Sequence, residues 1–155
     1  MPNWCEGTLR IRGNMSDVIR FFIEGVKCYT FSQTVDESGI KLDYDGEEEV
    51  LISVSKVAHI SGTTKAFIDP TDIYLLLRKD GTTVATVNTR QAWDILSSEF
   101  LEISRKYGVD MRIYGFERAM EFNREVIIEK GKIIKDDVIE FDDYDWECIM
   151  PNLGG

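Results

Sequence analysis

Histidine, cysteine and long apolar runs are all scarce in this sequence of 155 residues. The single histidine is His59, and the three cysteines, Cys5, Cys28 and Cys148, lie far apart along the chain. An odd number of distant cysteines indicates neither a disulfide framework nor a Cys-x-x-Cys metal site. We expect buried free thiols, because a catalytic thiol would also need a base close by.

No apolar segment approaches the roughly 18 residues that a membrane-spanning helix needs. The run at residues 73–77 is among the longest. The N-terminus also lacks the basic region and apolar stretch of a secretory signal. These absences predict a cytoplasmic protein with no membrane partner.

Motifs for catalysis and cofactor binding are missing as well. The sequence has no serine nucleophile elbow, phosphate-binding loop or dinucleotide glycine pattern. His59 lies at an expected strand end, where a structural or surface role fits it best. Residues 43–46 resemble part of a calcium loop, but Lys41 occupies the position of the first ligand. We therefore expect a non-enzymatic protein with no cofactor and no metal site.

Negative charge is abundant and unevenly placed. The chain carries a net charge of −10. Residues 36–49 contain seven acids and one lysine, and residues 136–147 contain seven acids and no base. These two segments outweigh the whole net charge, so the rest of the chain is slightly positive.

The first element is expected almost at the start of the chain. Residues 5–12 alternate between apolar or small side chains and polar ones, which predicts a strand with one buried face. A helix should follow directly, because apolar residues then recur every three or four positions. Asn14 or Ser16 would cap this helix, and Gly25 would end it.

The second half of the chain predicts another helix and two hairpins. Asn88 or Thr89 would cap the helix, which ends at Gly108. One hairpin would turn at residues 79–81, where Asp-Gly separates two β-rich runs, and the other at residues 130–131. The strands expected after the first helix cover residues 50–57, 72–78, 82–87, 109–116, 121–129 and 132–141.

This order of elements predicts an α+β protein with the ferredoxin-like βαββαβ fold. That fold has an antiparallel sheet with two helices on one face, and here it would carry an extra C-terminal hairpin. Residues 27–49 have little to bury and are expected to form an acidic loop or insertion. We expect a single domain over residues 1–147 and a frayed tail over residues 148–155.

Several segments resemble the YubB-type ferredoxin-like family, small proteins found mostly on phages and plasmids. The opening residues 1–13 match its Met-Pro-Asn-Trp-Cys-x-x-x-Leu-x-Ile-x-Gly signature, and the hairpin over residues 121–141 matches its usual ending. Residues 62–65 and 86–93 resemble its Trp-Gly-Thr-Lys-Trp and Phe-x-Thr-Ala-Trp-Ser-Pro-Pro segments. Both tryptophans around residues 62–65 and the Ser-Pro-Pro after Trp93 are absent here. The resemblance implies the ferredoxin-like fold and a mobile-element origin, and it brings no catalytic residues.

The acidic patches favour a protein-interaction module as the function. Concentrated acids suit docking to a basic surface, because electrostatic attraction raises the rate of association. The partner would be a host or phage protein, and the chain itself a monomer or a homodimer. The acids expected to contact it are Asp136, Asp137, Glu140, Asp142, Asp143 and Asp145.

Two alternatives stay open at this point. If strands 4–12 and 109–116 are neighbours, arginines and aromatics share the sheet face away from the helices, an arrangement that RNA-recognition modules use. Single-stranded nucleic acid would then contact Arg10, Arg12, Arg112, Tyr114 and Phe116. A chain of net charge −10 repels phosphates, however, so nucleic acid is the less favoured partner. The second alternative is a small-molecule-binding or enzymatic domain.

Overall fold

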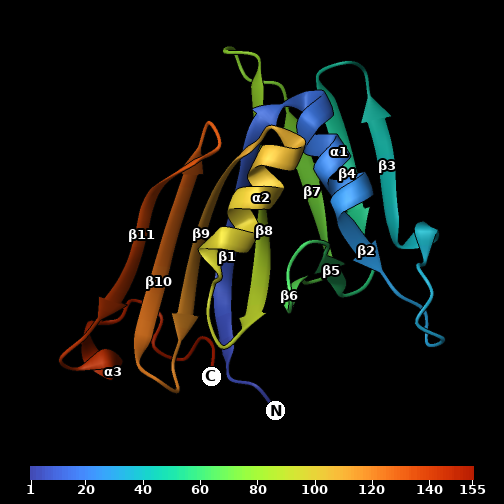
Figure 1. Cartoon of the computed structure of the whole chain (residues 1–155). Helices are drawn as coiled ribbons and strands as arrows, with labels where there is room; N and C mark the ends of the chain where they lie inside the picture. The colour runs from blue at the N-terminus through green and yellow to red at the C-terminus, as the bar shows by residue number, and fades with distance from the viewer.

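Most of the regular structure is β-strand, as the computed structural model of residues 1–155 shows (Figure 1). The strands are β1 (Trp4–Asn14), β2 (Val26–Cys28), β3 (Ile40–Asp45), β4 (Glu49–Val54), β5 (Ala58–Ile60), β6 (Ala66–Ile68), β7 (Thr71–Leu76), β8 (Thr82–Ala92), β9 (Asp110–Glu117), β10 (Phe122–Glu129) and β11 (Lys132–Glu140). The helices are α1 (Met15–Gly25), α2 (Ser97–Tyr107) and the short α3 (Tyr144–Glu147), with one 3₁₀ turn at Glu37–Gly39. None of the helices has the length and apolar character needed to cross a membrane.

The strands form two antiparallel sheets. The large sheet has eight strands in the order β11-β10-β9-β1-β8-β6-β5-β2, and the small sheet has three in the order β3-β4-β7. Helices α1 and α2 lie side by side on one face of the large sheet, and the small sheet lies beside α1 (Figure 1).

The predicted ferredoxin-like α+β fold is wrong, because the chain is mostly β. Seven strands, β2 to β8, lie between α1 and α2, where the βαββαβ plan has two. The main source of the error is the segment expected to be an acidic loop. Within it, Ile40, Leu42 and Tyr44 alternate with charged residues and form β3, which pairs with β4. Because this edge strand is rich in charged residues, its alternation of apolar and charged side chains was not recognised as a strand pattern.

Strand β1 is at the centre of the large sheet, between β8 and β9, and the expected pairing of the first strand with the strand at residues 109–116 is confirmed. Its residues Cys5, Leu9 and Ile11 are fully buried on the helix side. Gly7 lies in the same row, and a Cβ atom there would stand 1.8 Å from the carbonyl oxygen of Tyr114. Only glycine fits at this position of β1, between its neighbours β8 and β9.

The first helix agrees with the sequence prediction, and the second agrees at its end, Gly108, but not at its start. Asn14 caps α1 by accepting a hydrogen bond from the backbone N–H of Asp17 at 2.9 Å. The predicted start of the second helix at Asn88 or Thr89 lies inside β8 instead. Strand β8 pairs with β1 along its whole length, so the ladder outweighs the local capping signal in that segment.

One hairpin forms as expected, and the other does not. Strands β10 and β11 pair around Lys130 and Gly131, both at positive φ. The turn at Arg78–Thr82 also exists, since the N–H of Arg78 donates to the Thr82 carbonyl at 2.8 Å. The strands on either side of it join different sheets, however: β7 pairs with β4, and β8 with β1 and β6.

A single hydrophobic core of 28 buried residues spans both sheets. Ile52 and Leu75 from the small sheet belong to the same core as Leu9 of β1 and Phe21 of α1. A smaller cluster forms where α3 and the C-terminal tail pack on the large sheet. There the final N–H, of Gly155, donates to the carbonyl of Trp4 at 2.8 Å, which brings the two ends of the chain together.

Candidate functional site

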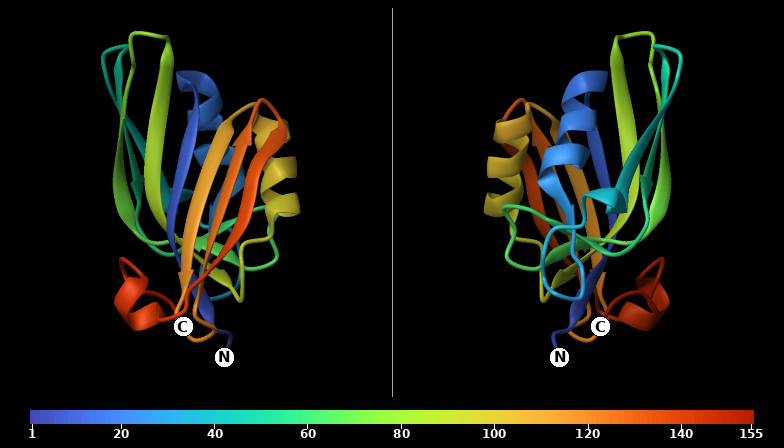
Figure 2. Two further views of the ribbon diagram at one scale, coloured as in Figure 1. Left: turned by 90° about the vertical axis from the view of Figure 1, so that its left-hand side faces the viewer. Right: turned by 90° about the vertical axis from the view of Figure 1, so that its right-hand side faces the viewer.

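The centre of the large sheet is uncovered on the face opposite α1 and α2. Figure 2 shows α1 and α2 on one side of this sheet and α3 on the other, at one end. Several side chains that point to this face are exposed, among them Arg10 of β1, Thr86 of β8 and Arg112 of β9. We call this surface the open face.

Strand pairing brings arginines together on the open face. Arg10 of β1 lies directly opposite Arg112 of β9, and Arg12 lies opposite Asp110. Like charges opposite each other on neighbouring strands destabilise a sheet. This juxtaposition is therefore a feature that stability alone does not favour.

Four arginines line one hollow on the open face, with a volume of about 230 Å³. They are Arg10, Arg12, Arg78 and Arg112, and the carboxylates of Asp110 and Glu129 line it too. We call this group the arginine hollow.

The four guanidinium groups differ in their partners. Arg12 is paired with Asp110 at 2.7 Å, and this hydrogen bond raises the pKa of Arg12. Arg112 lies 3.4 Å from the carboxylate of Glu125. No carboxylate lies within ion-pair distance of Arg10 or of Arg78. Half of the hollow's positive charge is thus uncompensated.

The carboxylate of Glu125 is held in its charged form beside the hollow. Lys135 donates a hydrogen bond to it and lowers its pKa, burial acts in the opposite direction, and Arg112 lowers the pKa further. Glu125 therefore fixes Arg112 in place without removing its exposure to solvent, since the Arg112 side chain is about half exposed.

Two aromatic residues expected on this face have different surroundings. Tyr114 is half-buried, and its hydroxyl accepts a hydrogen bond from Asn123 at 3.1 Å. Phe116 is only 7% exposed, because Tyr144 and Cys148 pack over it. Of the five residues predicted for nucleic-acid binding, the structure brings Arg10, Arg12 and Arg112 together, leaves Tyr114 at their edge and covers Phe116.

The sequence analysis did not identify a row of aromatic and basic residues on the open face. We call it the aromatic row. The ring centroids of Trp4 and Phe67 are 6.0 Å apart, and those of Phe67 and His59 are 5.5 Å apart. The guanidinium of Arg90 lies over the Trp4 ring, 5.7 Å from its centroid. These residues come from β1, β5, β6 and β8, so no local pattern in the sequence could have joined them.

The six acids predicted for protein binding lie in three different settings. Asp136 accepts hydrogen bonds from Ser97 and Arg124; burial works against its charged form, but these bonds outweigh it and lower the pKa. Asp137 lies 3.7 Å from Lys135. Asp143 caps α3 by accepting from the N–H of Trp146. The remaining three, Glu140, Asp142 and Asp145, make no ion pair.

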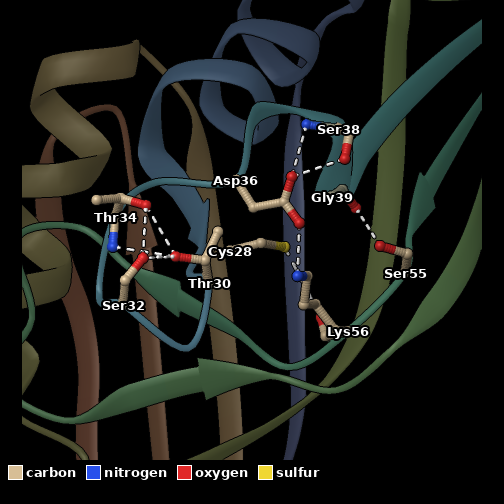
Figure 3. A network of polar contacts seen from close by, with 9 residues as sticks. All are labelled: Cys28, Thr30, Ser32, Thr34, Asp36, Ser38, Gly39, Ser55 and Lys56. Atoms are coloured by element: carbon tan, nitrogen blue, oxygen red, sulfur yellow. Dashed lines mark hydrogen bonds and ion pairs between the residues drawn. The ribbon is translucent and has the colours of Figure 1, made fainter.

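The first acidic segment contains a carboxylate with a structural role. Asp36 forms an ion pair with Lys56 and accepts hydrogen bonds from the N–H and hydroxyl of Ser38 (Figure 3). The Lys56 bond, followed by the Ser38 bonds, lowers the pKa of Asp36 from 3.8 to about 2. In the adjacent turn, the hydroxyl of Thr30 bonds those of Ser32 and Thr34, as Figure 3 also shows.

The three thiols are free and buried. Burial raises the pKa of Cys5 and that of Cys28, which keeps both in the unreactive thiol form. No group of three or more histidine, cysteine, aspartate or glutamate side chains is arranged to hold a metal ion.

Comparison with models of protein families, with curated proteins and with solved structures gives no match. The resemblance to the YubB-type family and the phage or plasmid origin that it implies therefore stay predictions. The arginine hollow and the aromatic row are the features from which a function has to be argued.

Proposed function

We propose that the chain binds single-stranded nucleic acid on the open face, with the arginine hollow contacting phosphates. The observation that carries the proposal is the pair Arg10 and Arg78, two guanidinium groups without a carboxylate partner in a chain of net charge −10. Two free cations in one hollow fit an anionic ligand, because nothing in the chain compensates their charge. Arginine also matches the geometry of a phosphate better than lysine does.

The aromatic side chains of the open face favour single-stranded over double-stranded nucleic acid as the ligand. Trp4, Phe67 and Tyr114 are half-buried on the same face as the arginines and offer part of their rings to a base. Base stacking on aromatic side chains contributes about 1–3 kcal/mol per base and needs unpaired bases. A sheet face with arginines and aromatics suits that mode of binding.

The excess of acids does not oppose this site directly. Around the hollow, Arg12 pairs with Asp110 and Glu129, and Glu125 pairs with Lys135 and Arg112, so these three acids are matched by three cations. The unpaired acids lie mainly on the β3–β4 hairpin and around α3. Charges more than about 10 Å away are screened at about 0.1 M salt, so the local excess of arginine governs binding.

Fluorescence anisotropy with labelled oligo-dT and oligo-rU, at about 50 mM salt, tests the proposal. We expect binding that weakens steeply with salt and is not displaced by duplex DNA. Arg10→Ala and Arg78→Ala should each weaken it about tenfold and make the salt dependence shallower by about 0.7 in log–log slope, as expected for one lost phosphate contact.

Arg105→Ala is the matched control. Arg105 is an exposed arginine of α2 on the opposite face, and its removal should leave the affinity unchanged. Absence of binding at low salt, or equal losses for Arg10→Ala and Arg105→Ala, would contradict the proposal.

A second candidate function, docking of a basic protein, is favoured by the surface around α3. Trp146 is 86% exposed and Ile149 is 85% exposed, although the segment is firmly held. The Tyr144 hydroxyl donates to Asn123 at 2.8 Å beneath them. A rigidly held tryptophan is a common hot spot of protein interfaces, and Asp142 and Asp145 beside it would attract basic residues.

This second candidate is tested by cross-linking from position 146 with a photoreactive residue, followed by pull-down. We expect one protein to be captured in stoichiometric amount and lost in Trp146→Ala and in the double variant Asp142→Lys/Asp145→Lys. Asp143 is left unchanged because it caps α3, so its reversal would disturb the segment itself. If both variants captured the same protein as the unaltered chain, this surface would be excluded as the docking site.

A further inference from the structure

A second cavity, with a volume of about 370 Å³, lies on the helix side of the large sheet. It is formed by the loop before β6, the end of β8 and the start of α2. Among its lining residues are Thr64, Lys65, Gln91, Trp93, Leu96 and Glu99. Pockets for small ligands have volumes of about 300–1,000 Å³ and combine apolar walls with a few polar groups.

Gln91 is the most unusual group in this cavity. It is 3% exposed, its Nε2 donates to the Thr89 hydroxyl at 3.1 Å, and its Oε1 has no hydrogen-bond partner. Turning the amide over would only leave the nitrogen unpaired instead. Buried polar groups in proteins are almost always satisfied, so this amide lacks a partner that the chain itself does not provide.

Two charged groups at the same cavity also have free bonding capacity. Glu99 uses Oε2 to accept from the N–H of Thr64 at 2.7 Å and from its hydroxyl, while Oε1 makes no hydrogen bond. Lys65 is exposed and forms no ion pair. Asp94 also lines the cavity, but its carboxylate is paired with Arg124 at 2.8 Å. The cavity thus offers free acceptors from Gln91 and Glu99 and one free cation.

The remaining wall is apolar and partly exposed to solvent. Trp93 is 58% exposed and Leu96 is half exposed. Trp93 also has φ = 72°, a left-handed conformation that non-glycine residues rarely adopt, and its N–H donates to the Asn3 carbonyl. Residues held in such conformations cluster at ligand sites. The strain here keeps an indole at the mouth of the cavity.

We propose that this cavity binds a free α-amino acid with an apolar side chain. Its ammonium group would donate to Oε1 of Gln91 and to Glu99, and its carboxylate would pair with Lys65. Its side chain would lie against Trp93 and Leu96. This ligand class is the one that uses the orphaned acceptor, the free carboxylate oxygen, the free cation and the apolar wall together.

The inference is independent of nucleic-acid binding, because the cavity and the arginine hollow lie on opposite faces of the sheet and share no residue. Either proposal can fail without affecting the other.

Isothermal titration calorimetry with L-leucine and L-phenylalanine as probes tests the inference. Two leucine derivatives are the controls: N-acetyl-L-leucine lacks the ammonium group, and L-leucinamide lacks the carboxylate. We expect leucine or phenylalanine to bind with a dissociation constant in the micromolar to millimolar range, and each derivative to bind at least about tenfold more weakly.

Two variants connect the binding to named atoms. Gln91→Leu, which removes the orphaned acceptor at similar volume, should weaken leucine binding about tenfold. Lys65→Met should weaken leucine binding by a similar factor and leave the weak binding of leucinamide unchanged. Lys79→Met, in a distant turn, is the matched control and should change neither.

Three results would overturn the proposal. They are no binding of either amino acid at millimolar concentration, leucinamide binding as tightly as leucine, and unchanged leucine affinity in Gln91→Leu. The melting temperature of each variant separates a loss of binding from a loss of folding.

Discussion

At the scale of single residues, Asp36 shows how a charged side chain in an acidic segment can have a structural role. Its bonds to Lys56 and Ser38 favour the carboxylate, so protonation is expected only near pH 2. A depressed folded-state pKa gives stability that is present above pH about 4 and is lost as the pH falls toward 2. We expect NMR titration of the Asp36 carboxyl group to give a pKa of about 2.

Lys56→Met should move that pKa upward toward the ordinary aspartate value, because the largest cause of the depression is removed. Lys79→Met should leave it in place. If the Asp36 pKa were ordinary in the unaltered protein, the ion pair in Figure 3 would not exist in solution.

At the scale of elements, the sequence correctly predicted those strands, helices and hairpins whose formation depends on local interactions. Strand β1, helix α1 and the β10–β11 hairpin each have a clear period or turn signal, and all three formed as expected. The capping signal at Asn88 failed, because that residue lies in the middle of a ladder with β1. Competition between a cap and a long-range strand pairing cannot be judged from one segment alone.

The candidate site was predictable only in part for the same reason. Arg10 and Arg112 follow from alternation and from the pairing of β1 with β9. Arg78 could not be found, because its place in the hollow depends on β7 joining another sheet than β8. Phe116 was expected in the open because nothing local shows that α3 folds back over it.

At the scale of the whole molecule, the shared core predicts that the two sheets unfold as one cooperative unit. Buried residues of the small sheet, such as Ile52, belong to the same core as those of the large sheet. The three tryptophans, Trp4, Trp93 and Trp146, all lie on or beside the large sheet, so their fluorescence reports on that sheet alone.

Because the tryptophans report on the large sheet alone, a substitution in the small sheet can test whether the two sheets unfold together. Ile52→Ala removes a fully buried side chain from the small sheet and should lower the free energy of unfolding by about 2–5 kcal/mol. In urea, tryptophan fluorescence and far-ultraviolet circular dichroism should shift together to the same lower midpoint, because one core cannot lose half of its packing and keep the rest. Tyr74→Ala, an exposed change on a neighbouring strand, is the control and should move the midpoint little. A fluorescence transition that stayed at its original midpoint in Ile52→Ala would mean that the small sheet unfolds separately, and the shared core would then not act as a unit.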